Sequence, residues 1–157
     1  MRWIAALMLA AASPAMASDY VVIKLGADLS VSADTAWAKV GKFCAIEAWG
    51  KLPCTLASGT GDVGSVRSLA GGKVEEPMVG QTARSYTYGQ TVGGNKGIDY
   101  HGTLAVAPTG RTTSHLSYIL LYDQSLVPED KREGMRTQMP VRFQTFVDNL
   151  KKMAEAK

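Results

Sequence analysis

The chain has 157 residues, 46% of them hydrophobic and 20% charged, and this size and composition fit one domain with a core of its own. Its 17 basic and 14 acidic residues form no run of like charge. A nucleic-acid partner is therefore not expected, because binding phosphates requires a clustered basic patch.

The first seventeen residues have the features of a secretory signal peptide. Met1-Arg2-Trp3 is a short basic start, residues 4–12 are apolar, and Ala15-Met16-Ala17 fits a cleavage site. The apolar run is too short to serve as a permanent membrane anchor. We therefore predict export to the periplasm or to the outside, a mature chain that begins near Ser18, and a single domain over residues 18–157.

The mature chain is predicted to begin with a strand and two short helices. Loose alternation of apolar residues over positions 20–29 indicates the strand. Ser32 is a good helix N-cap, and apolar residues at helical spacing follow it up to Gly41, where we expect the first helix to end. Residues 43–49 indicate a second short helix, which Gly50 and Pro53 stop.

The two cysteines, Cys44 and Cys54, would meet an oxidising compartment after export. A disulfide between them would tie the second helix to the following strand, and closing so small a loop would stabilise the fold by about 2–3 kcal/mol. A reactive or metal-binding thiol pair is the alternative. Neither a Cys-x-x-Cys spacing nor a neighbouring histidine supports that alternative.

The rest of the chain is predicted to be a meander followed by one long helix. Turn signals recur every eight to twelve residues after Pro53 and indicate six antiparallel strands. Residues 128–157 indicate an amphipathic helix that must bury its apolar stripe on the sheet. The stripe is either plain core or a wall that contacts a ligand, and it consists of Met135, Met139, Phe143, Phe146, Leu150 and Met153.

This order of elements resembles the helix-grip fold of the START and Bet v 1-like (SRPBCC) superfamily, and within it the polyketide cyclase/dehydrase branch. The likeness covers nearly the whole mature chain, and the segments that carry it are residues 33–41, Trp49, and residues 64–67, 74–77, 85–88 and 100–106. It implies an α+β domain in which a seven-stranded antiparallel sheet wraps around a long C-terminal helix, with two short helices after the first strand. It also implies a deep apolar cavity, which relatives use to hold lipids, sterols, polyketides or plant hormones.

One hairpin places two opposite charges in the expected cavity. The turn Ala70-Gly71-Gly72-Lys73 predicts a register in which Arg67 lies opposite Glu76 on an apolar, inward face. A buried charge needs a partner, so an ion pair is expected. The pair either anchors a polar group of a ligand or is a structural salt bridge that satisfies only itself.

A second hairpin sets the remaining walls. Pro108-Thr109-Gly110 predicts a three-residue loop with a left-handed Gly110, which would place Ala107 opposite Arg111. In that register both histidines, His101 and His115, point away from the cavity, where neither can act as a general base.

The expected ligand-binding set combines the ion pair with aromatic and aliphatic side chains. The tyrosines would supply aromatic walls with hydroxyl tips, although each could equally be an ordinary strand aromatic. The set is Arg67, Glu76, Tyr86, Tyr88, Tyr100, Tyr118, Leu104, Leu116, Met139 and Phe143.

The sequence contains no phosphate-binding loop, no zinc-protease motif and no nucleophile elbow, so we predict neither a metal nor a cofactor. The function expected from these patterns and the resemblance is an exported protein that holds a small hydrophobic or aromatic molecule. The alternative is a cofactor-independent enzyme of the polyketide cyclase or aromatase type, with Glu76 and Arg67 as candidate catalytic residues. The oligomeric state is left open.

Overall fold

The computed structural model describes residues 17–157, so the predicted signal peptide lies outside the described residues except for Ala17. Strand β1 (Tyr20–Leu29) leads into α1 (Ala33–Val40), the short 3-10 helix η1 (Phe43–Ala45) and α2 (Ile46–Gly50). These bounds confirm the predicted first strand and short helices. The Ser32 side chain accepts a hydrogen bond from the Thr35 amide, and Gly41 is the C-cap of α1, as expected.

Six more strands complete one antiparallel sheet of seven, with the order β1-β7-β6-β5-β4-β3-β2. They are β2 (Cys54–Ser58), β3 (Val66–Leu69), β4 (Val74–Thr82), β5 (Ser85–Gly89), β6 (His101–Pro108) and β7 (Ser114–Asp123), followed by a second 3-10 helix, η2 (Gln124–Leu126). The chain ends with α3 (Glu129–Glu155), a helix of 27 residues. The α+β helix-grip architecture is therefore confirmed.

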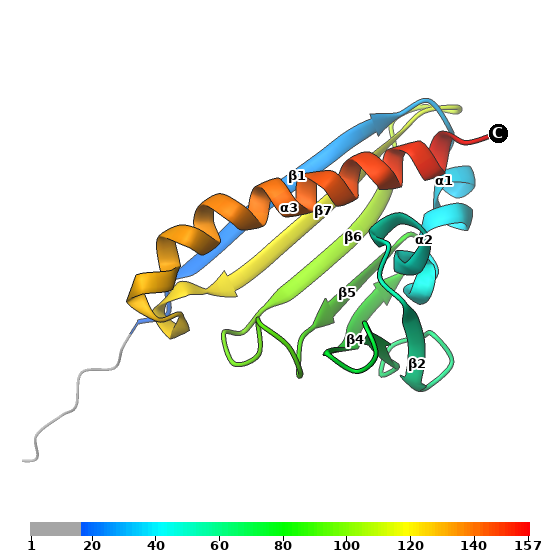
Figure 1. Ribbon diagram of the computed structural model, residues 1–157. Coiled ribbons are helices and arrows are strands. Elements are labelled where there is room, and N and C mark those ends of the chain that lie inside the picture. The colour runs from blue at the N-terminus through cyan, green and yellow to red at the C-terminus, as the bar shows by residue number, and fades with distance from the viewer. Residues whose placement is uncertain (1–16) are drawn as a thin grey trace, which may run out of the picture.

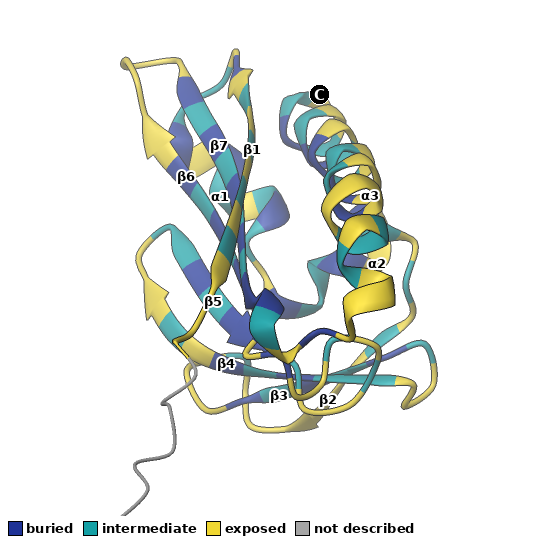
Figure 2. Cartoon of the chain, turned by 90° about the vertical axis from the view of Figure 1, so that its left-hand side faces the viewer, coloured by how far each residue is buried: buried dark blue, intermediate teal, exposed yellow. Residues whose placement is uncertain are grey.

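The sheet bends so that its concave face surrounds the helices (Figure 2). Helix α3 runs along β1 and β7, while α1 and α2 pack beside the second half of α3 (Figure 1). Alternate residues of the strands point inward and are buried, as a half-covered antiparallel sheet requires. No helix among residues 17–157 is both long and apolar enough to cross a membrane.

The first hairpin has the predicted register. Arg67 pairs with Glu76 and Leu69 with Val74. Three successive residues of the turn, Ala70, Gly71 and Gly72, have φ angles of 51°, 70° and 88°. The two glycines adopt such angles without the steric cost of a Cβ atom, which explains why the turn forms at these residues and sets the register of the hairpin.

The second hairpin differs from the prediction. Strand β6 continues to Pro108, which pairs with Ser114, so Ala107 lies opposite His115 rather than Arg111. The loop is longer because Thr113 accepts hydrogen bonds from the amides of both Thr109 and Gly110. Gly110 does not have a positive φ. The register moves by four residues along β7, an even number, so every side chain keeps its predicted face.

The predicted disulfide is present. Cys44 in η1 is bonded to Cys54, the first residue of β2. The bond ties the short helices to the edge strand of the sheet, next to Phe43, whose ring is buried.

Candidate functional site

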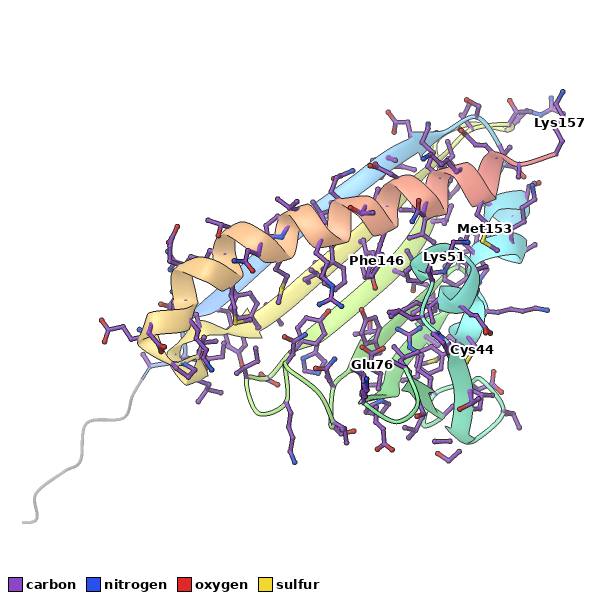
Figure 3. The ribbon with its side chains drawn as sticks, viewed as in Figure 1. Cys44, Lys51, Glu76, Phe146, Met153 and Lys157 are labelled. Carbon is purple, nitrogen blue, oxygen red and sulfur yellow. A yellow bond between two sulfur atoms is a disulfide. The ribbon has the colours of Figure 1, made fainter. Side chains whose placement is uncertain are left out.

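A pocket of about 870 Å³ lies between α3 and the sheet. In Figure 3, Phe146 projects from α3 toward the sheet, and Glu76 lies on the part of the sheet that contains β4. The pocket is open to solvent on one side, where its rim is formed by exposed side chains of α3 and of the β3–β4 hairpin. Its volume falls within the range of about 300–1,000 Å³ that is usual for small-molecule sites.

Three tyrosines form the polar floor of the pocket. The hydroxyl oxygen of Tyr88 lies 2.7 Å from that of Tyr118 and 3.4 Å from that of Tyr100. All three side chains are buried; Tyr88 is in β5, Tyr118 is in β7, and Tyr100 directly precedes β6. Burial raises the pKa of Tyr88 and Tyr118 well above 10.0 and also raises the pKa of Tyr100. The three hydroxyls are therefore neutral at pH 7, and each can donate or accept a hydrogen bond.

Glu76 brings a carboxylate to the same floor. Its Oε2 accepts a hydrogen bond of 2.8 Å from Nε of Arg67, and its Oε1 accepts one of 3.3 Å from the side-chain amide of Gln90. Gln90 in turn accepts a hydrogen bond of 2.6 Å from the backbone amide of Asn95, in the glycine-rich loop after β5 (residues 93–97). Gln90 and Asn95 both line the pocket, so this loop is coupled to the position of the carboxylate.

Arg67 lies behind Glu76 and does not line the pocket. Its side chain is completely buried, with Nη1 donating a hydrogen bond of 2.7 Å to the Phe43 carbonyl oxygen. Its Nη2 lies 2.7 Å from Oε2 of Glu76 as an ionic contact without hydrogen-bond alignment. The guanidinium carbon lies 4.4 Å from the centre of the Phe43 ring and 4.6 Å from that of Tyr88, so cation–π contacts add to the ion pair.

The wall opposite this floor belongs to α3. Met139 and Phe143 are buried and line the pocket, together with the partly exposed Met135 and Phe146. Phe143 packs edge-on against Tyr118 with a centroid separation of 5.3 Å, and Phe146 packs in the same way against Phe143. These contacts hold the aromatic wall in place from both helix and sheet.

Six of the ten side chains predicted to bind a ligand line this pocket: Glu76, Tyr88, Tyr100, Tyr118, Met139 and Phe143. The other four, Arg67, Tyr86, Leu104 and Leu116, are buried in the core outside it. Tyr86 is covered by the rings of Trp37 and Phe43, at centroid separations of 5.9 and 5.4 Å. Helix α1 and η1 thus cover this part of the concave face, and the pocket lies beside it.

Several lining residues were absent from the predicted set. Some belong to the second helix and to the first hairpin, and others to the glycine-rich loop and to the exposed edge of α3. They include Ile46, Leu69, Val74, Asn95, Lys73, Lys131 and Arg142. The rim residues could not be found from apolar periodicity, because exposed cations at a mouth look like any solvated helix face.

The two histidines lie outside the lining of the pocket. The ring of His101 hydrogen-bonds the backbone of Asp99, and that of His115 lies 2.7 Å from the carboxylate of Asp28. Within residues 17–157 no group of three or more histidine, cysteine, aspartate or glutamate side chains is placed to hold a metal ion.

The comparisons with known proteins agree with this architecture. The family model described as polyketide cyclase / dehydrase and lipid transport matches residues 22–155. No curated protein matches the sequence significantly.

Solved structures share the fold at low sequence identity. A protein from Thermobifida fusca is similar over 85% of this chain and 91% of its own, with a TM-score of 0.70 and 19% identity. Truncated norcoclaurine synthase from Thalictrum flavum is similar over 92% of this chain and 99% of its own, with a TM-score of 0.65 and 18% identity. For Ara h 8.0201 the shares are 84% and 98%, with a TM-score of 0.58 and 11% identity.

Proposed function

Because this chain belongs to the polyketide cyclase / dehydrase and lipid transport family of the SRPBCC (START and Bet v 1-like) superfamily, we propose that it binds a small hydrophobic or aromatic molecule between the sheet and α3. The observation that carries the proposal is the pocket itself, about 870 Å³ in volume, with apolar walls and a floor of three tyrosine hydroxyls and one carboxylate. Apolar walls with a few convergent polar groups are typical of sites for small organic ligands.

The walls would supply the affinity and the floor would supply the orientation. Each square ångström of apolar surface that a ligand removes from water contributes about 25 cal/mol before the costs of ordering are subtracted. The hydroxyls of Tyr88, Tyr100 and Tyr118 can both donate and accept, so a carbonyl or hydroxyl group of the ligand could bind there.

The most direct test is to identify what the protein carries. The protein is purified without detergent from the exported fraction of its native host, and extracted molecules are identified by mass spectrometry. We expect a recurrent lipophilic or ring-bearing compound at a near-stoichiometric amount. An empty protein that also fails to bind a neutral apolar fluorophore, such as N-phenyl-1-naphthylamine, would overturn the proposal.

We also propose that the protein acts outside the cytoplasm. The signal-like features of residues 1–17 and the Cys44–Cys54 disulfide both support an oxidising compartment. Intact-mass measurement of the exported protein tests this directly, and we expect a mature chain that begins near Ser18. A cytoplasmic protein that retains Met1 or Arg2 would contradict export.

A second candidate function is cofactor-independent catalysis on a similar ligand. The observation that favours it is the position of Glu76, whose carboxylate reaches the pocket beside three neutral hydroxyls. In such a reaction Glu76 would take a proton from carbon or oxygen, a tyrosine hydroxyl would hydrogen-bond the developing oxyanion, and Arg67 would hold the carboxylate in place.

Carriage and catalysis are separated by following the fate of a bound ligand. Conversion of a polyketide-like substrate by the wild type, lost in Glu76→Gln while binding of the substrate is retained, would support an enzyme. Recovery of the ligand unchanged from both proteins would support a carrier.

A further inference from the structure

The rim of the pocket is positively charged. Three exposed cations line it: Lys73 in the β3–β4 hairpin, Lys131 in the first turn of α3, and Arg142 on the same helix. Within residues 17–157 none of the three forms a salt bridge. Asp130 is an acidic residue of this rim, so the lining residues of the mouth carry more positive than negative charge.

The beginning of α3 brings both signs of charge to the rim. The helix starts at Glu129, and its first turn, with Lys131, lies at the rim. The free amides at a helix N-terminus carry a partial positive charge that favours anions. The carboxylates of Glu129 and Asp130 in the same turn offset this partial charge, so the charge preference of the mouth depends on the three side-chain cations.

The floor of the pocket, in contrast, carries no net charge. The carboxylate of Glu76 is compensated by the guanidinium of Arg67, and its other oxygen is bound by Gln90. The remaining polar groups of the floor are the neutral hydroxyls of Tyr88, Tyr100 and Tyr118. An anionic group at the floor would meet the carboxylate of Glu76, which lines the pocket while Arg67 does not, whereas a carbonyl or hydroxyl group would meet matching hydrogen-bond partners.

We propose that the ligand is an amphipathic organic anion, with its anionic group at the rim beside Lys73, Lys131 and Arg142 and a neutral apolar or hydrogen-bonding end on the tyrosine floor. This inference rests on the proposed ligand-binding function and specifies its chemical class. The anion fits a carboxylate, sulfonate or phosphate equally, because the rim offers charge rather than a fixed two-pronged geometry. An exposed ion pair typically changes an equilibrium constant by at most about fivefold, so the three cations together would give a preference of about tenfold or more at low salt.

The experiment measures competition within an isosteric series. N-phenyl-1-naphthylamine reports occupancy of the pocket by fluorescence, and it is displaced by 2-naphthylacetate, 2-(2-naphthyl)ethanol or 2-(2-naphthyl)ethylammonium at pH 7.5. We expect the anion to compete at about one-tenth of the concentration of the cation, with the alcohol between them. Raising the salt from 20 mM to about 1 M should reduce this preference, because the Debye length falls to about 3 Å.

Two triple variants assign the preference to the rim. Lys73→Ala/Lys131→Ala/Arg142→Ala should remove most of the preference for the anion, and each competitor is compared with the affinity of the same variant for the fluorophore. The control Lys24→Ala/Lys42→Ala/Lys152→Ala removes the same charge from exposed positions outside the lining, and it should keep the preference.

The outcomes separate this inference from the function on which it rests. Fluorophore binding with equal competition by all three compounds, or an anion preference that both triple variants lose equally, would overturn the anionic-ligand inference and leave the binding function standing. No fluorophore binding and no competition by any of the compounds would overturn both.

Discussion

The hydroxyl oxygens of Tyr88 and Tyr118 lie 2.7 Å apart, although the two residues belong to different strands and are 30 positions apart in the chain. Both side chains are at least 98% buried, with exposures of 2% and 1%. The hydrogen bond therefore joins β5 to β7 across the intervening strand β6, close to Gly102, where a Cβ atom would lie 2.4 Å from the Tyr88 ring. Gly102 is thus needed for the tyrosines to meet.

The first prediction is that alkaline pH destabilises the fold. All six tyrosines have raised pKa values; burial is the main cause for five of them, and for Tyr20 it is a hydrogen bond to Asp99. The unfolded chain releases these protons near pH 10 and the folded chain releases them later, so the stabilisation is complete below pH 10 and is lost as the pH rises above it. Each buried tyrosine that stays protonated should lower the unfolding free energy by up to about 1.4 kcal/mol per pH unit.

Urea unfolding between pH 7 and 11 measures this loss. Tyr118→Phe is the matched variant, because it removes one ionisable hydroxyl and one buried hydrogen bond but keeps the ring. It should cost about 0.5–1.5 kcal/mol at pH 7 and show a shallower decline above pH 10. An unfolding free energy that stays constant up to pH 11 in the wild type would contradict the burial of these hydroxyls.

The second prediction separates the two members of the buried ion pair. Arg67→Met leaves the carboxylate of Glu76 buried without a charge partner and should cost about 3–5 kcal/mol of stability. Glu76→Gln keeps a carbonyl acceptor for Arg67, which also retains the Phe43 carbonyl, so it should cost less, about 1–3 kcal/mol. Urea unfolding of the single variants and of the double variant gives the coupling, which we expect to exceed about 1 kcal/mol.

Ligand binding should respond in the opposite order. Glu76 lines the pocket and Arg67 does not. The ligand affinity of folded Glu76→Gln should therefore change through a lost contact with the ligand, whereas Arg67 acts by positioning the carboxylate. If Glu76→Gln lost stability while fluorophore and ligand affinities were unchanged, the carboxylate would be a structural partner of Arg67 and not a ligand anchor.

The third prediction concerns the disulfide. The bond closes a loop over a sequence separation of 10, so breaking it should reduce the unfolding free energy by about 2–3 kcal/mol. Thermal unfolding with and without a reductant measures the effect. The double variant Cys44→Ser/Cys54→Ser should resemble the reduced protein and should not respond to reductant. Equal stability of the oxidised and reduced wild type would show that the helices hold their place without the bond.

The two hairpins show where sequence patterns suffice and where they do not. Between β3 and β4 the turn glycines occupy positive-φ positions, so the register of Arg67 and Glu76 followed from counting outward from the turn. Between β6 and β7 the hydrogen bonds of Thr113 extend the loop beyond Gly110, and no glycine pattern signals that extension.

The candidate site was predictable only in part, for a reason that lies in packing. Alternation assigned Leu104 and Leu116 correctly to the inward face, but it says nothing about which half of that face is covered. Helix α1 contacts both β6 and β7 and fills that half, so both leucines are core residues, with no exposed surface. The pocket remains where α3 spans the other half, over Tyr88 and Tyr118.

The last prediction tests the pocket through a single position of α3. Gly134 lines the pocket, and a Cβ atom there would have only the Gln138 side chain within 4 Å, at 3.9 Å. Gly134→Ala should therefore stabilise the helix by about 0.5–1 kcal/mol and leave binding intact.

Gly134→Trp should place an indole in the mouth and weaken fluorophore binding by at least about tenfold, because the ligand and the new ring would compete for the same volume. Val141→Trp is the matched control, since Val141 is 70% exposed on α3 and lies outside the lining, and it should bind like the wild type. Fluorescence titration of the three variants decides the matter: equal affinities in Gly134→Trp and Val141→Trp would mean that the probe binds elsewhere on the protein.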